Sequence, residues 1–218
     1  MTQDEFERTI NAFDGTESMR GNIYYRVLDL IKANFVVEAH LLFLSTWNFA
    51  RFRYVITSFD LPAYEALLQN LSDQLQPLAR ADFASVNFDQ YREMISDSFD
   101  RLAAVNGVEF TGAAKVLHLL NPRVFLMWDS AISGWHTPRA DYHHLQVVRS
   151  GFWTPPNYRF ARSGTGYHDF LVYCQSRFSG LVSPSPRKTL AKCIDEFNYC
   201  SITKCLADRG GHNNQGEI

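Results

Sequence analysis

The chain has 218 residues, of which 46% are apolar and 20% are charged, a composition that is ordinary for a globular protein and unlike that of a disordered one. Its longest apolar stretch, Phe35 to Leu44, is much shorter than the about 20 apolar residues that cross a bilayer. The first twenty residues carry five acidic side chains and lack the apolar core of a signal peptide. These features predict a soluble, cytoplasmic protein with no membrane segment.

The formal net charge of −2 conceals an uneven distribution of charge along the chain. Residues 1–105 contain 9 Lys and Arg against 15 Asp and Glu, a net of −6, whereas residues 136–192 contain 8 against 2, a net of +6. A folded chain divided in this way can bind a polyanion on one side only. The average charge therefore does not exclude a nucleic acid partner, although a solvated surface would also account for the basic stretch.

Apolar residues recur at helical spacing almost throughout the chain. This spacing predicts helices within residues 24–35, 88–102, 116–120, 170–178 and 190–197. The third must end at Asn121-Pro122, because proline cannot continue a helix. Alternation typical of a strand is confined to Phe52–Ile56. The predicted fold class is all-α, with one helical domain over residues 1–208 and a flexible, polar tail over residues 209–218.

The longest break between predicted helices covers residues 136–166, which contain several prolines and glycines. Loops of this length in compact domains are usually functional or disordered. The mixture of aromatic and cationic side chains favours a function here. We expect Arg159 and Arg162 to contact the phosphate groups of a nucleic acid, which supply affinity without sequence information.

A tight turn between two helices is predicted at Asn106–Gly112. Gly107 and Gly112 mark its two corners, and Thr111 lies just before the helix that Gly112 opens. Glycines let backbone amides approach a neighbouring group, and the N-terminus of the new helix favours an anion. The turn is therefore a candidate phosphate-binding hairpin, and Gly107, Gly112 and Thr111 are its candidate DNA-binding residues.

Lys115 on that second helix and Asp129 after an apolar bridge are the candidate catalytic residues. We expect the bend between them to bring both side chains toward one cleft. A carboxylate stabilises the positive charge that develops on a sugar when its glycosidic bond breaks, and a desolvated lysine can attack the sugar carbon. Because a neighbouring carboxylate raises the pKa of a lysine, the lysine must also be buried. The simpler alternatives are a helix cap for Asp129 and a solvated surface position for Lys115.

The motif Gly112-Ala113-Ala114-Lys115, followed by Phe125-Leu126-Met127-Trp128-Asp129, resembles the helix-hairpin-helix DNA glycosylase superfamily over residues 87–135. The resemblance implies a two-lobed helical fold with the helix-hairpin-helix at about residues 87–120. It also implies a DNA N-glycosylase that flips a base out of the duplex and excises it. The matching positions make Asp129 the aspartate essential for excision and Lys115 the nucleophile, with associated lyase activity if Lys115 forms a Schiff base.

Lys-Val-Leu-His-Leu-Leu-Asn-Pro, from Lys115, and then Trp-Asp-Ser, from Trp128, are most similar to a divergent branch associated with hypermodified pyrimidines in phage DNA. This similarity implies excision of a bulky base such as glucosylated hydroxymethylcytosine, leaving abasic sites in antiviral defence. The alternatives are a repair glycosylase for oxidised or alkylated bases, a non-catalytic helix-hairpin-helix DNA-binding module, and a helical protein-interaction domain. The expected partner is double-stranded DNA, and we expect a monomer.

A flipped base needs aromatic faces on which to stack, and Trp47 and Trp153 are the candidates for such a wall. The histidines show no spacing typical of a structural zinc site. Cys174, Cys193, Cys200 and Cys205 are spaced unlike the ligands of an iron–sulfur cluster, so we expect buried core cysteines. Neither a metal nor another cofactor is predicted.

Overall fold

The computed structural model describes residues 1–135 and 158–204 of the chain. The regular elements within these residues are helices, which confirms the all-α class. They are α1 Gln3–Thr16, α2 Ser18–Lys32, α3 Val36–Trp47, α4 Phe49–Phe52, α5 Leu61–Gln74, α6 Arg92–Ala103, α7 Glu109–Leu120, α8 Gly164–Arg177 and α9 Leu190–Asn198, with short 3-10 helices at Gln76–Leu78 and Phe88–Tyr91 and a π-helix, η5, at Tyr199–Lys204.

The helix boundaries follow from local sequence signals. The side chains of Asp60, Ser163 and Thr189 accept hydrogen bonds from backbone amides in the first turns of α5, α8 and α9. α7 ends at Leu120, directly before Asn121-Pro122, as the proline predicts. The strand expected at Phe52–Ile56 is wrong: Phe52 ends α4, and the amide of Val55 bonds back to the carbonyl of Phe52 within a turn.

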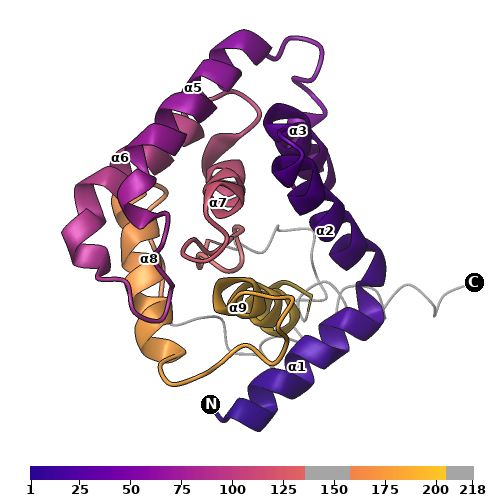
Figure 1. Cartoon of the computed structure of the whole chain (residues 1–218), viewed down its shortest axis with the longest axis vertical. Coiled ribbons are helices and arrows are strands. Elements are labelled where there is room, and N and C mark those ends of the chain that lie inside the picture. Colours follow the sequence, from indigo (N-terminus) through magenta and orange to yellow (C-terminus); the bar gives the residue numbers. More distant parts are fainter. Residues whose placement is uncertain (136–157, 205–218) are drawn as a thin grey trace, which may run out of the picture.

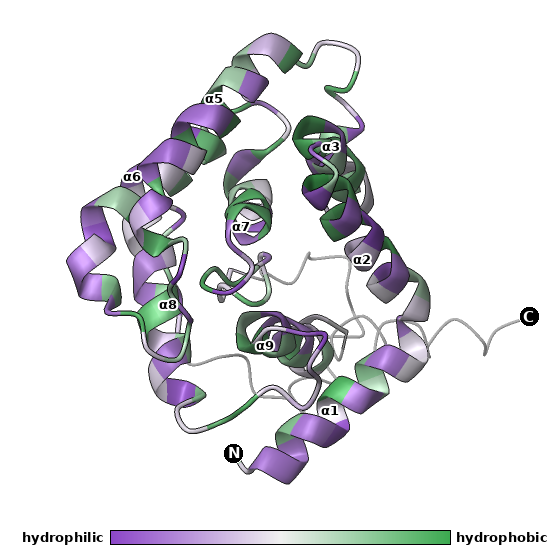
Figure 2. Ribbon diagram, in the orientation of Figure 1, coloured by the Kyte–Doolittle hydropathy of each residue, from purple (hydrophilic) through white to green (hydrophobic). Residues whose placement is uncertain are grey.

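α7 is the central helix of the fold, with α3 on one side and α6 and α8 on the other (Figure 1). α9 packs on α1. Figure 2 shows that α7 is apolar over most of its surface, whereas α5 and α6 are largely hydrophilic on their outer sides. The main core includes Trp128, whose ring lies edge-on to Phe99 at 5.6 Å between centroids. Buried aromatic rings thus tie the segment that follows α7 to α6 and, through the contact of Trp128 with Tyr167, to α8.

A second apolar cluster lies among α2, α3 and the C-terminal end of α7. It includes Tyr24, Phe43 and Leu119, and Met127 joins it from the segment that follows α7. The next residue, Trp128, belongs to the main core. The segment 121–135, called the bridge below, therefore runs along the junction of the two apolar clusters. Such junctions are common places for ligand pockets.

Within the two described ranges, no helix combines the length and the apolarity that a membrane span would require. The tail predicted over residues 209–218 and most of the loop predicted at 136–166 fall outside the described residues.

Candidate active site

The hairpin before α7 is held by a buried side chain that the sequence analysis missed. Asn48, at the end of α3, donates from Nδ2 to the carbonyl oxygens of Gly107 at 2.8 Å and Val108 at 3.0 Å. Gly107 has φ +87°, and a Cβ added there would overlap Cγ2 of Val55. The bend therefore requires glycine at this position both for its backbone conformation and for space. Buried polar residues of this kind carry no local sequence signal.

Gly112 has a different role from the one predicted. α7 begins at Glu109, three residues earlier than expected, so Gly112 lies inside the helix and not at a corner. Its amide donates to the carbonyl oxygen of Val108 at 2.9 Å, and the position of its missing Cβ lies 3.0 Å from Nδ2 of Asn48. Gly112 thus permits close packing against α3, and its amide is already engaged within the chain.

Arg159 and Arg162 lie beside the start of α7. The Arg162 guanidinium is 4.5 Å from the ring centroid of Phe110 and 4.7 Å from that of Trp135, and the Arg159 guanidinium is 3.4 Å from the Trp135 centroid. Both arginines are exposed. Stacking on the two aromatic rings holds their cations close to the hairpin, as a phosphate-binding role would need. Trp153 lies outside the described residues.

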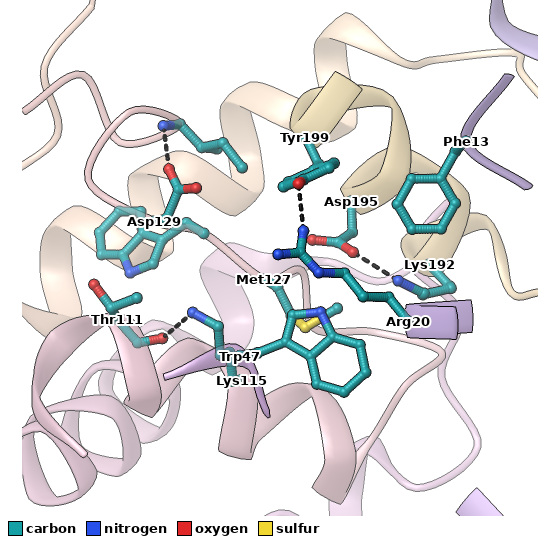
Figure 3. Close-up of a pocket in the computed structure, with 12 residues that line it drawn as sticks. Phe13, Arg20, Trp47, Thr111, Lys115, Met127, Asp129, Lys192, Asp195 and Tyr199 are labelled. Carbon is teal, nitrogen blue, oxygen red and sulfur yellow. Dashed lines mark hydrogen bonds and ion pairs between the residues drawn. The ribbon is translucent and has the colours of Figure 1, made fainter. Parts of the chain in front are cut away.

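A cavity of about 160 Å³ opens where the bridge, α7 and α9 meet (Figure 3). Four residues singled out from the sequence line it together: Trp47, Thr111, Lys115 and Asp129. Three more lining residues, Met127, Trp128 and Ile132, belong to the bridge, and the others come from elements distant in sequence; they are Phe13, Arg20, Lys192, Asp195 and Tyr199. The fold thus brings both candidate catalytic side chains and one candidate stacking ring to a single pocket.

Lys115 is buried, with only 5% of its surface exposed, and is not a solvated surface residue. Its Nζ donates to the carbonyl oxygen of Thr111 at 3.2 Å. Burial lowers the pKa of Lys115 to about 8, although the carboxylates of Asp129 and Asp195 act in the opposite direction. A substantial fraction of the amine is therefore neutral near pH 8, which is the form that acts as a nucleophile.

The Asp129 carboxylate is oriented by three hydrogen bonds. Oδ1 accepts from the amides of Ala131 and Ile132, both at 2.8 Å, and Oδ2 accepts from Oγ1 of Thr203 at 2.7 Å. Asp129 thus caps a turn over residues 130–134, where the sequence analysis considered a helix cap, and it lines the pocket as well. Charge-assisted hydrogen bonds of this length hold a carboxylate in one orientation. The cap and the catalytic role are compatible here, rather than alternatives.

α9 supplies a charged wall that sequence reasoning missed. Nζ of Lys192 lies 2.8 Å from Oδ2 of Asp195 and 3.6 Å from Oε1 of Glu196, and all three residues are buried. Burial lowers the pKa of Lys192, but the two carboxylates outweigh it and hold that pKa above its usual value. Spacings of three and four residues indicate an ion-pair cluster on a helix. They do not distinguish a buried cluster from a surface one.

The predicted core positions of two cysteines are confirmed. Cys174 and Cys193 are buried, Cys200 is partly buried, and Cys205 lies outside the described residues. His118, three residues from Lys115 on α7, is fully buried. Its ring contacts Oη of Tyr24 at 2.9 Å and the carbonyl oxygen of Phe125 at 2.7 Å, which joins α2 to the bridge.

No protein-family model, curated protein or solved structure matches the chain. The chemistry of the site therefore rests on its geometry: a buried amine of lowered pKa and an oriented carboxylate in one pocket, with aromatic surface beside them.

Proposed function

We propose that the protein is a DNA glycosylase, which takes one modified base out of a DNA duplex into the pocket and cleaves its N-glycosidic bond. The observation that carries this proposal is that one cavity is lined by both Lys115, which is buried and has a pKa of about 8, and the oriented carboxylate of Asp129. The family resemblance favours a bulky modified pyrimidine of phage DNA, such as glucosylated hydroxymethylcytosine, as substrate in antiviral defence.

In the proposed reaction, the bond between C1′ and the base nitrogen breaks, and its electron pair leaves with the base. Asp129 stabilises the positive charge that develops on the deoxyribose. Neutral Lys115 then donates its lone pair to C1′, and the proton that Nζ loses neutralises the departing base. The C1′–O4′ bond then breaks as the lone pair on Nζ forms the C=N bond of a protonated Schiff base, and O4′ takes a proton from water. Hydrolysis of the Schiff base returns the free amine and leaves an abasic site.

In the proposed complex, the exposed guanidinium groups of Arg159 and Arg162 face the DNA backbone beside the hairpin. Gly107 itself is buried, so it shapes the bend rather than contacting a phosphate. Phe110 supports this arrangement, because its ring contacts Arg162 while its neighbour Thr111 lines the pocket. The proposed phosphate contacts and the pocket are thus adjacent at the start of α7. Backbone contacts position the duplex, and the pocket selects the base.

The test is release of a base from duplexes that carry 5-hydroxymethylcytosine, with or without a glucosyl group, or no modification. Asp129→Asn is the informative variant, because its side-chain oxygen can still accept from the amides of Ala131 and Ile132. Lys115→Met retains the length of the side chain without its amine. Asp29→Asn and Lys32→Met remove the same charges from exposed positions on α2 and serve as matched controls.

We expect the wild type and both controls to release the modified base, and we expect Asp129→Asn to lose at least a hundredfold in rate. Borohydride should trap a covalent complex with the wild type and none with Lys115→Met. Base release by Lys115→Met without trapping would assign the nucleophile to water. Binding of DNA without release of any base would reject the glycosylase and leave a non-catalytic DNA-binding module.

A further inference from the structure

The pocket has two chemically different walls (Figure 3). α7 and the bridge supply Lys115 and Asp129, to which the proposed reaction assigns bond cleavage. The other wall presents Asp195 and Lys192 from α9, together with Arg20 from α2. Cleavage of the glycosidic bond does not use this second wall. Its one carboxylate and two cations nevertheless form a set of one hydrogen-bond acceptor and several donors.

One of the two carboxylate oxygens of Asp195 is available to accept a hydrogen bond from a ligand. Its Oδ2 is engaged by Nζ of Lys192 at 2.8 Å, whereas among the described residues Oδ1 accepts no hydrogen bond. The side chain is only 12% exposed, and the residue lines the cavity. Oδ1 is not among the fully buried side-chain atoms that lack a partner, so it is accessible from the cavity. A ligand that carries a hydrogen-bond donor would satisfy it.

The dimensions of the cavity limit the ring that can enter. Its volume is about 160 Å³, and an engineered apolar cavity of about 150 Å³ accommodates one benzene molecule. Trp47, Phe13 and Met127 offer apolar surface to the faces of such a ring. One six-membered ring therefore matches the pocket, and a fused second ring or a large substituent would extend through its open side.

We infer that Asp195 selects the base: Oδ1 accepts a hydrogen bond from the exocyclic amino group of a single-ring base, so the pocket takes a cytosine derivative in preference to a uracil derivative or a purine. An acidic side chain that accepts from the cytosine amino group is a general mode of base recognition. Arg20 and Lys192 are donors for the ring acceptors beside that group. This inference rests on the proposed function, since it names the base on which the same site acts.

The variant Asp195→Asn reverses the hydrogen-bonding character of this wall. Lys192 has only donors, so the oxygen of the introduced amide stays with Nζ and the NH₂ group turns toward the base. An acceptor thus becomes a donor, which suits the 4-oxo group of a uracil derivative. We expect the wild type to prefer 5-hydroxymethylcytosine over 5-hydroxymethyluracil by about tenfold or more in kcat/KM, and Asp195→Asn to lose or invert that preference.

The experiment compares three duplexes that differ only in the target base: 5-hydroxymethylcytosine, 5-hydroxymethyluracil and 8-oxoguanine. Base release is measured under single-turnover conditions for the wild type, Asp195→Asn and the exposed control Asp29→Asn. Affinity for the same duplex with an abasic site checks that the DNA-binding surface is intact, and it should be the same for all three proteins. The wild-type comparison of substrates needs no variant and stands even if Asp195→Asn fails to fold.

Preference of the wild type for the cytosine derivative, no release of 8-oxoguanine, and loss of the preference in Asp195→Asn would support the inference. Equal rates on the two pyrimidines, or a variant that slows both equally, would overturn it while leaving the glycosylase intact. Release of no base from these duplexes or from one that carries glucosylated 5-hydroxymethylcytosine, by wild-type protein that binds the abasic duplex, would instead reject the proposed function itself.

Discussion

Thr203, in the π-helix η5, donates a hydrogen bond to Oδ2 of Asp129 at 2.7 Å, which joins residues 74 positions apart. The other oxygen of Asp129 is held by two amides of its own turn. The orientation of the carboxylate in the pocket therefore depends on the last described element of the chain. π-helical turns occur frequently at functional sites.

Thr203→Val should lower kcat for base release by about tenfold or more and leave KM unchanged. The variant removes one hydrogen bond to a charged group, worth roughly 1.5–3 kcal/mol, without changing the shape of the side chain. Thr203→Ser keeps the hydroxyl and should restore most of the rate. A loss that the serine variant shares, or a change confined to KM, would argue against a positioning role.

The rate of Schiff-base formation should rise with pH and level off above about pH 8. In the proposed reaction only the neutral amine of Lys115 attacks C1′, and its pKa is about 8 because burial disfavours the ammonium form. The yield of borohydride trapping as a function of pH measures this titration directly. A profile that keeps rising to pH 10 would show that Lys115 titrates as an ordinary exposed lysine.

Lys115→Met should stabilise the protein at pH 7 by about 2 kcal/mol. In the folded state the pKa of Lys115 is about 8, whereas in the unfolded chain it is about 10.4. Between these values the unfolded state binds more protons, so wild-type stability rises with pH across that window. The methionine variant should lack this contribution. Urea unfolding of both proteins at pH 7 and pH 10 measures their free energies of unfolding. A difference between the two proteins that is larger at pH 10 than at pH 7 would contradict the prediction.

Gly107→Ala should destabilise the fold by about 3 kcal/mol. The residue has φ +87°, and the added methyl group would overlap Cγ2 of Val55. Gly21→Ala is the matched control, because Gly21 lies within α2 with open space around its Cα, so that alanine there should stabilise by up to about 1 kcal/mol. Chemical denaturation measures both changes. Equal effects of the two substitutions would mean that the hairpin is not held as described.

Replacement of Arg159 and Arg162 together by alanine should weaken DNA binding equally for all sequences. Both guanidinium groups are exposed and stack on Trp135. Loss of two phosphate contacts should reduce the slope of log affinity against log salt by about 2. Binding titrations at several salt concentrations measure that slope, with the exposed Arg8→Ala on α1 as control. A loss that depends on the target base would place these arginines in the pocket instead.

α2, α6, α7, α8 and α9 were predictable from the sequence because their determinants are local, whereas α1, α3 and α5 were not among the predicted helices. The spacing of apolar residues and the stop at Asn121-Pro122 act within a few residues of the backbone they control. The motif around Lys115 and the position of Asp129 ahead of a turn were readable for the same reason. Gly112 was wrongly predicted to start a helix, because the sequence alone does not distinguish a glycine at a corner from a glycine at a close packing contact.

Only the tertiary structure decided the character of the pocket. Asp195 and Lys192 on α9 lie about 80 residues from Lys115 along the chain, and no spacing rule connects them. The lowered pKa of Lys115 is likewise a property of packing, because it arises from the removal of water by helices that meet around the amine. Periodicity and capping are set along the chain, whereas burial and the approach of charges are set by how the helices pack.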